Sequence, residues 1–115
     1  RMTRAEIIEL QTRLAELGYL ESEMNETYLD FSMALSLIKQ GGRVARVGWN
    51  GKGMFIFLVP GSQFTVSRPP LLGIYPEGTQ IDYHAHVDMR TANGQIAPWL
   101  CSQTDLLAND WVIVE

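Results

Sequence analysis

The sequence predicts an α+β fold, a single domain in which N-terminal helices pack on a mainly antiparallel β-sheet. Apolar residues recur at helical spacing over residues 3–17 and 30–39, and from residue 44 onward short apolar strands follow. Asn93-Gly94 lies between two such strands and is typical of a tight hairpin, which joins antiparallel neighbours. At 115 residues and 46% hydrophobic content, the chain can bury one core.

The first predicted helix begins at Thr3, which with Glu6 forms a capping-box pattern. It ends at Gly18, a residue suited to the C-cap, and an acidic linker follows over residues 21–26. We expect residues 1–26 to form an accessory helix and polar linker, and residues 27–115 to form the functional domain. The apolar positions of this helix are Ile7, Leu10, Leu14 and Leu17.

A second helix is predicted between the N-cap Asp30 and the stop signal Gly41-Gly42. Lys39 lies in its last turn, where a positive charge complements the helix dipole. We expect this helix to lie in the core. Its predicted apolar face consists of Phe31, Ala34, Leu35 and Ile38.

Strands are expected to follow this helix. A short strand over residues 44–47 leads to a glycine-rich corner at residues 48–53, and a buried strand over residues 54–59 comes next. Residues 64–66 can pair after it. Residues 67–78 contain three prolines and two glycines, so the sequence predicts a long loop, a feature that is often functional.

Residues 80–89 are expected to form the clearest strand, because apolar and polar side chains alternate along it. A two-residue turn at Asn93-Gly94 would place Trp99 opposite Asp88, on the polar face. We further expect a short capped turn at residues 102–108 and a last strand at 111–114, with Trp111 in the core. The polar face of the strand carries Asp82, His84, His86, Asp88 and Arg90.

Charge and cysteine content limit the partners of the chain. The net charge of −4 gives no general attraction for nucleic acid or an anionic membrane, so an anionic ligand needs a local site. One cysteine excludes an internal disulfide and suits a reducing cytoplasm. The sequence shows no apolar stretch long enough to span a membrane. Because Met2 follows Arg1, we expect the natural start at Met2.

Several chemistries are weighed and set aside. His84, His86 and Asp88 point the same way along a strand, but residues in a row on one strand are too spread to hold one ion alone. The glycine corner lacks the ending of a phosphate loop and leads into a strand. Cys101 is expected to be a packing residue. The sequence therefore predicts no catalytic residue, metal or cofactor.

From about residue 31 to 115 the chain resembles the phage Thoeris anti-defence 2-like domain, formerly a domain of unknown function. Several strings match in order, and the helix over residues 3–17 lies outside the resemblance. His84 departs from the family pattern, where another residue is usual. The matching strings are Gly42-Arg43-Val44-Ala45-Arg46, Gly48-Trp49-Asn50-Gly51-Lys52-Gly53-Met54, Val59-Pro60-Gly61-Ser62, Arg68-Pro69-Pro70-Leu71, His86-Val87-Asp88-Met89, Pro98-Trp99-Leu100 and Ser102-Gln103-Thr104-Asp105.

The resemblance implies a sponge, a viral protein that binds and sequesters a cyclic nucleotide immune signal without cleaving it. In similar proteins the signal is a glycocyclic ADP-ribose made by a TIR-domain enzyme, and some members also hold cyclic dinucleotides at a separate site. It further implies a homotetramer with pockets between subunits, acting in the cytoplasm of the infected bacterial host. Residues 27–115 would then be the cyclic-nucleotide-binding domain.

The resemblance carries over Trp49, Trp99 and Asp105 as ligand-binding residues by motif position. The two indoles can sandwich a base or ribose, and the carboxylate can accept hydrogen bonds from ribose hydroxyls. Further candidates rest on their chemistry: a second acceptor, adaptable hydrogen-bonding groups and arginines for the pyrophosphate. These are Asp88, Asn50, Ser102, Gln103, Arg46 and Arg68.

Two other classes of function remain open at this point. A nucleotide hydrolase would return an altered ligand. A structural or interaction protein would use the same aromatic residues as a subunit interface and bind no small molecule.

Overall fold

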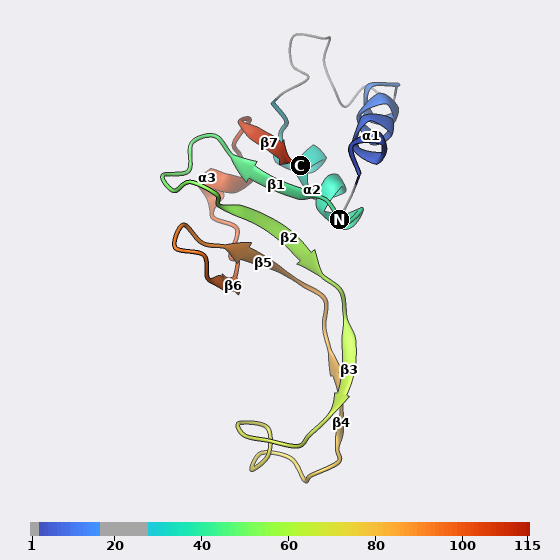
Figure 1. Ribbon diagram of the computed structural model, residues 1–115, viewed down its shortest axis with the longest axis vertical. Coiled ribbons are helices and arrows are strands. Elements are labelled where there is room, and N and C mark those ends of the chain that lie inside the picture. The colour runs from blue at the N-terminus through green and yellow to red at the C-terminus, as the bar shows by residue number, and fades with distance from the viewer. Residues whose placement is uncertain (1–2, 17–27) are drawn as a thin grey trace.

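The computed structural model describes residues 3–16 and 28–115 (Figure 1). In these residues two helices come first, and the strands follow with one short helix before the last of them. The predicted Gly18 stop and the linker at residues 21–26 lie outside the described residues. In chain order the elements are α1 (Arg4–Glu16), α2 (Phe31–Lys39), β1 (Arg43–Arg46), β2 (Phe55–Val59), β3 (Ser62–Thr65), β4 (Gln80–Tyr83), β5 (His86–Arg90), β6 (Ile96–Pro98), α3 (Gln103–Leu106) and β7 (Trp111–Val114).

The strands form a five-stranded sheet in the order β6-β5-β2-β1-β7 and a two-stranded ribbon of β3 and β4. Each of these pairings is antiparallel, so the predicted α+β class with a mainly antiparallel sheet is confirmed. The last strand, β7, returns beside β1 and places Trp111 opposite Arg46. Among the described helices, none has the length and apolarity that crossing a membrane requires.

Helix α1 begins with the predicted capping box. The backbone N–H of Thr3 donates to Oε1 of Glu6, and the backbone N–H of Glu6 donates to Oγ1 of Thr3, each at 3.1 Å. Ile7 is buried, and α1 contacts α2. The capping box therefore fixes the start of a helix that packs on the second helix.

Helix α2 has the caps that the sequence predicts. Asp30 accepts a hydrogen bond from the backbone N–H of Met33 at 3.0 Å. At the other end Gly42 donates to the carbonyl of Leu37 and Gly41 to that of Ile38, the double bond of a Schellman motif. Gly41 has a φ of +91°, a conformation that glycine adopts readily.

The buried face of α2 is rotated by one residue from the prediction. Met33 and Leu37 are buried beside Ala34 and Ile38, whereas Leu35 is only half-buried. Both sets have helical spacing, because most residues of this short helix are apolar. The packing partner, which the sequence does not show, decides between them.

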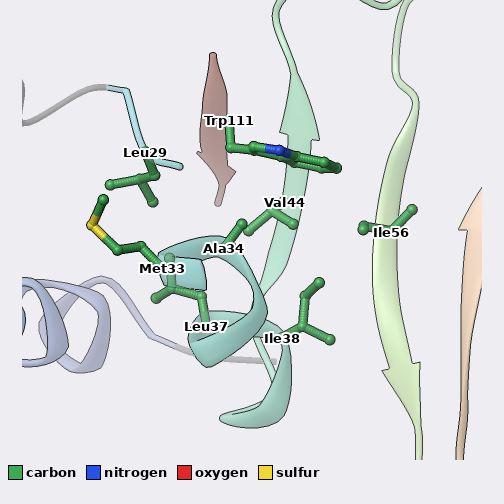
Figure 2. Close-up of a cluster of buried hydrophobic side chains, with 8 residues drawn as sticks. All are labelled: Leu29, Met33, Ala34, Leu37, Ile38, Val44, Ile56 and Trp111. Carbon is green, nitrogen blue, oxygen red and sulfur yellow. The ribbon is translucent and has the colours of Figure 1, made fainter. Parts of the chain in front are cut away.

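That partner is the sheet, from which Val44, Ile56 and Trp111 meet the buried side chains of α2 (Figure 2). The core cluster joins α2 to β1, β2 and β7, and burial of each large side chain contributes on the order of 1.5–3 kcal/mol. The prediction that Trp111 lies in the core is confirmed, since its exposed fraction is 0%. The cluster consists of Leu29, Met33, Ala34, Leu37, Ile38, Val44, Ile56 and Trp111.

The prediction of a single strand over residues 80–89 is wrong. The segment is broken at His84-Ala85 into β4, which pairs with β3, and β5, which pairs with β2. Pro60 and Gly61 interrupt the partner strand at the same level, and proline cannot donate to a ladder. The outer half of this long hairpin therefore leaves the sheet as a separate ribbon (Figure 1).

The predicted register of the second hairpin is also wrong, by one residue. Arg90 pairs with Ile96 and Met89 with Ala97, because the loop contains three residues, 92–94. Gly94 occupies the left-handed position at φ +87° that closes such a loop. A shift of one residue moves a side chain to the other face of the sheet.

Trp99 therefore leaves the polar face where the predicted register placed it. Its backbone N–H donates to the carbonyl of Val87 at 3.0 Å, which aligns it with a strand residue that packs on the core. Asp88 stays on the opposite face and pairs with Phe57 and Pro98. The two residues consequently belong to different sides of the sheet.

Candidate functional site

Three tryptophans gather where β1 ends and β7 begins. The Trp49 ring lies 5.3 Å from the Trp111 ring in a T-shaped arrangement, and Trp99 approaches Trp111 edge-on at 6.2 Å. Phe31 packs against Trp99 and Trp111 at 6.1 and 5.4 Å. Trp49 and Trp99 are half-buried, so part of each indole faces solvent on either side of the buried Trp111.

An arginine and two carboxylates lie beside the tryptophans. The guanidinium of Arg46 donates to Oδ1 of Asp105 at 2.8 Å and to Oδ1 of Asp110 at 2.7 Å. The side chains of Arg46 and Asp105 are only 16% and 13% exposed. Shielding from water makes these charge-assisted bonds stronger than surface ion pairs.

The same carboxylates hold the glycine corner. The indole N–H of Trp49 donates to Oδ1 of Asp105 at 3.1 Å, and the backbone N–H of Gly48 donates to Oδ2 of Asp110 at 2.8 Å. Trp111 donates its indole N–H to the backbone carbonyl of Asp105 at 3.1 Å. We call Arg46, Asp105 and Asp110 the charged network, and it fixes Trp49 relative to α3.

The charged network shifts the pKa of each of its members. Burial raises the pKa of Asp105, but hydrogen bonds from Arg46, Trp49 and Ser102 outweigh it and hold that pKa below its ordinary value. The hydrogen bond from Arg46 likewise lowers the pKa of Asp110. Both carboxylates in turn raise the pKa of Arg46. All are therefore charged at neutral pH.

Helix α3 presents polar groups to the same place. Ser102 is its N-cap and accepts from the backbone N–H of Asp105 at 3.0 Å, which confirms the predicted capped turn. Gln103 is exposed at the first helical position, and Asn50 is exposed in the corner next to Trp49. Figure 1 shows α3 beside the end of β1.

The structure thus brings together most of the candidates from the sequence but not all of them. Asp88 lies on the far face of the sheet, where Nε2 of His86 is 3.5 Å from its Oδ1. Arg68 is exposed on the loop between β3 and β4, at the other end of the molecule. The candidates that share one region are Arg46, Trp49, Asn50, Trp99, Ser102, Gln103 and Asp105.

The sequence profile of the Thoeris anti-defense 2-like domain matches residues 29–114. The chain belongs to the Thoeris anti-defense 2-like family. It is 38% identical over 89 residues to Thoeris anti-defense 2 of Bacillus phage SP01, which covers 77% of this chain and 98% of that protein.

Within this Thoeris anti-defense 2-like domain, the family match takes in the tryptophans, the charged network and the ribbon of β3 and β4. Helix α1 lies before the matched residues. The assignment of residues 1–26 to an accessory segment remains a prediction.

Reasoning from the sequence alone missed one residue of the site, Asp110. Asp110 immediately precedes β7, whose register against β1 places its neighbour Trp111 opposite Arg46. The predicted strands at residues 44–47 and 111–114 would have pointed to Asp110 only if they had been paired with each other. The signal is thus a strand pairing, which no local pattern in the sequence contains.

The sequence predicts no metal site at His84, His86 and Asp88, although the three residues alternate along one segment. Over residues 3–16 and 28–115, the structure contains no group of three or more histidine, cysteine, aspartate or glutamate side chains arranged to hold an ion. The strand breaks at His84, and the ring Nδ1 of His86 lies 3.0 Å from the carbonyl of His84.

Proposed function

We propose that this protein is a phage anti-Thoeris sponge that binds glycocyclic ADP-ribose, the signal of a TIR-domain enzyme, and sequesters it without cleavage. Membership of the Thoeris anti-defense 2-like family supports the anti-Thoeris role. The observation that supports a nucleotide ligand is the pair of half-buried indoles, Trp49 and Trp99, held on either side of Trp111. The protein acts in the cytoplasm of the infected bacterium.

The ligand contains one adenine, two riboses and a pyrophosphate, and the site offers a group for each part. The exposed parts of Trp49 and Trp99 stack on the base and a ribose, each stack contributing on the order of 1–3 kcal/mol. The exposed amides of Asn50, next to Trp49 in the corner, and of Gln103, at the start of α3, supply adaptable hydrogen bonds. Asp105 accepts from a ribose hydroxyl through Oδ2, the oxygen opposite its bonds to Arg46 and Trp49.

Arg46 takes a different role from the one expected on chemistry alone. Its guanidinium already donates to Asp105 and Asp110 and its side chain is only 16% exposed, so its charge is balanced by the carboxylates and largely shielded from a pyrophosphate. We therefore assign Arg46 as a positioning residue, which holds the corner and α3 at a fixed separation before the ligand arrives. Preorganisation of this kind reduces the entropy lost on binding.

Assembly completes the proposal. We propose a homotetramer in which pockets form between subunits, with cyclic dinucleotides as possible ligands of a separate site. The sheet face opposite α2 carries half-buried Phe55 and Phe57, whose rings lie 5.9 Å apart, and Arg43 stacks over Phe55 at 4.9 Å. An aromatic face of this kind suits contact with another copy.

Calorimetric titration tests the function directly. The purified protein is titrated with glycocyclic ADP-ribose and with a panel of cyclic dinucleotides, and the bound ligand is then released by heat and analysed by chromatography. Tight binding with chemically unchanged ligand is the expected result. Altered ligand would make the protein a nucleotide hydrolase, and absence of binding to every nucleotide would return it to an interaction protein.

A further inference from the structure

The ribbon of β3 and β4, together with the loop over residues 66–79, forms an arm that leaves the sheet (Figure 1). The arm holds its own shape: Val66 is 2% exposed, and it exchanges backbone hydrogen bonds with Thr79 and Gly78. On the arm lies a cavity of about 570 Å³. Its lining consists of Phe64, Thr65, Val66, Ser67, Arg68, Pro69, Pro70, Leu71 and Tyr83.

The arm exposes more apolar surface than a two-stranded ribbon normally leaves in water. Ile74 is 69% exposed, Tyr83 51% and Tyr75 45%. An isolated pair of strands is marginally stable, and further packing is what usually makes such a ribbon persist. The arm therefore has the character of a segment that packs against another surface.

A second exposed apolar surface borders the candidate site. Leu100 is 90% exposed, Leu107 73% and Leu106 43%, and we call these residues the α3 rim. Leu100 directly follows Trp99, and α3 carries Asp105. Exposed leucines in the two segments that carry Trp99 and Asp105 favour an interface over a solvated turn.

The charge in the lining of the arm cavity is opposite to the charge beside the α3 rim. Arg68 is the charged residue in the lining of the arm cavity. Beside the α3 rim, Asp105 and Asp110 share a single guanidinium, that of Arg46, so the charged network keeps one net negative charge. Apolar contact and opposite charge thus favour the same pairing.

One protomer cannot make this contact with itself. The arm extends from the end of β2 away from α3, in a molecule that is 56 Å long and 29 Å wide (Figure 1). In a dimer with a two-fold axis, the arm of each copy packs on the α3 rim of the other copy, so both arms are covered at once.

We propose that the arm cavity of one protomer seats the α3 rim of a second copy, and that Arg68 thereby reaches the neighbouring tryptophan site as the cation for the ligand's pyrophosphate. The part of this proposal that concerns the ligand rests on the proposed function. Arg68 is suited to the task because a guanidinium meets phosphate oxygens in a bidentate manner. The pocket is then incomplete in a single chain.

Crosslinking between two differently tagged chains tests the arrangement without any ligand. In a Cys101→Ser background, one chain carries Ser67→Cys in the arm cavity and the co-expressed chain carries Leu107→Cys on the α3 rim. We expect mild oxidation to join the two chains in high yield. The matched control replaces Leu107→Cys by Ile8→Cys, an apolar residue of α1 that is 53% exposed, and should give little product.

Equal yields with Leu107→Cys and Ile8→Cys, or a chain that sediments as a monomer, would overturn the arm exchange. Ligand titration of Arg68→Ala then tests the cation, with an expected loss of affinity of at least 10-fold and only partial recovery in Arg68→Lys, because lysine keeps the charge but not the bidentate geometry. Unchanged affinity in Arg68→Ala would remove Arg68 from the pocket. Crosslinking without ligand binding by the parent protein would reject the proposed function alone.

Discussion

At the scale of single residues, the site depends on groups that are already satisfied within one chain. Arg46 donates to Asp105 and Asp110, and Asp110 also accepts from the backbone N–H of Gly48 in the corner. Asp105 bonds Arg46 and the indole of Trp49 through the same oxygen, Oδ1. We infer that Arg46 and Asp110 position the pocket, and that the partly exposed indoles and amides, together with the other oxygen of Asp105, Oδ2, contact the ligand.

Trp99→Ala tests the contact role of an indole. We expect the dissociation constant for glycocyclic ADP-ribose to rise roughly 5- to 150-fold, since one stacked base contributes on the order of 1–3 kcal/mol. Calorimetry measures the constant, and circular dichroism verifies that the variant folds. Ile8→Ala, which truncates an apolar residue of α1 that is 53% exposed and lies outside the site and the α3 rim, is the control, and an equal loss there would place the contact elsewhere.

Trp111→Ala tests the packing role of the third tryptophan. Its side chain is fully buried between Trp49, Trp99 and Phe31, so we expect a loss of about 3–5 kcal/mol in the free energy of unfolding. Urea denaturation measures this loss. The control Ile8→Ala, at an exposed position of α1, should change the free energy of unfolding by less than about 0.5 kcal/mol.

The charged network predicts that the stability of the fold decreases at acidic pH. The pKa values of Asp105 and Asp110 are lowered by folding, so their stabilisation is present above the unfolded value of about 3.9 and is lost as pH falls through the folded values. We expect Asp110→Asn to show a smaller drop in urea midpoint between pH 6 and pH 3 than the parent. Asp82→Asn on the arm serves as control, and equal drops for both variants would contradict the role of the network.

At the scale of elements, the sequence is informative wherever one local pattern decides the outcome. Asp30 and Gly41-Gly42 delimit α2 because caps are local hydrogen bonds. The break at His84-Ala85 has no such signal, since alternation continues through it, and the interrupting Pro60 lies on the partner strand. The register after Asn93-Gly94 failed because this dipeptide fits loops of two and of three residues.

Asp30→Ala tests the cap of α2. We expect the free energy of unfolding to fall by about 1 kcal/mol, because the backbone N–H of Met33 loses its acceptor. Ser32→Ala is a matched control, since its hydroxyl donates to the same Asp30 oxygen at 2.7 Å but leaves the cap in place. Thermal unfolding followed by circular dichroism compares the two, and equal losses would show that the hydroxyl contact, rather than the cap, carries the effect.

At the scale of the whole molecule, the sequence identifies the residues of the candidate site but not how the site closes. Strings from residues 42 to 105 point to Trp49, Trp99 and Asp105, and folding brings these three to one region. Arg68 shares the same sequence resemblance but lies at the far end of the arm. A pocket that forms between copies depends on their mutual orientation, which no pattern within one chain contains.

Helix α1 gives the last test at this scale, because it packs on α2 yet precedes the residues that the family matches. Deletion of residues 1–27 should leave ligand affinity and assembly unchanged. It should lower the free energy of unfolding by about 1.5–3 kcal/mol, because the buried side chain of Ile7 is lost. Calorimetry, sedimentation and urea denaturation measure the three quantities, and Ile7→Ala in the full chain should reproduce most of the stability loss. If the truncated chain loses its ligand, α1 belongs to the pocket; if it dissociates, α1 belongs to the subunit interface.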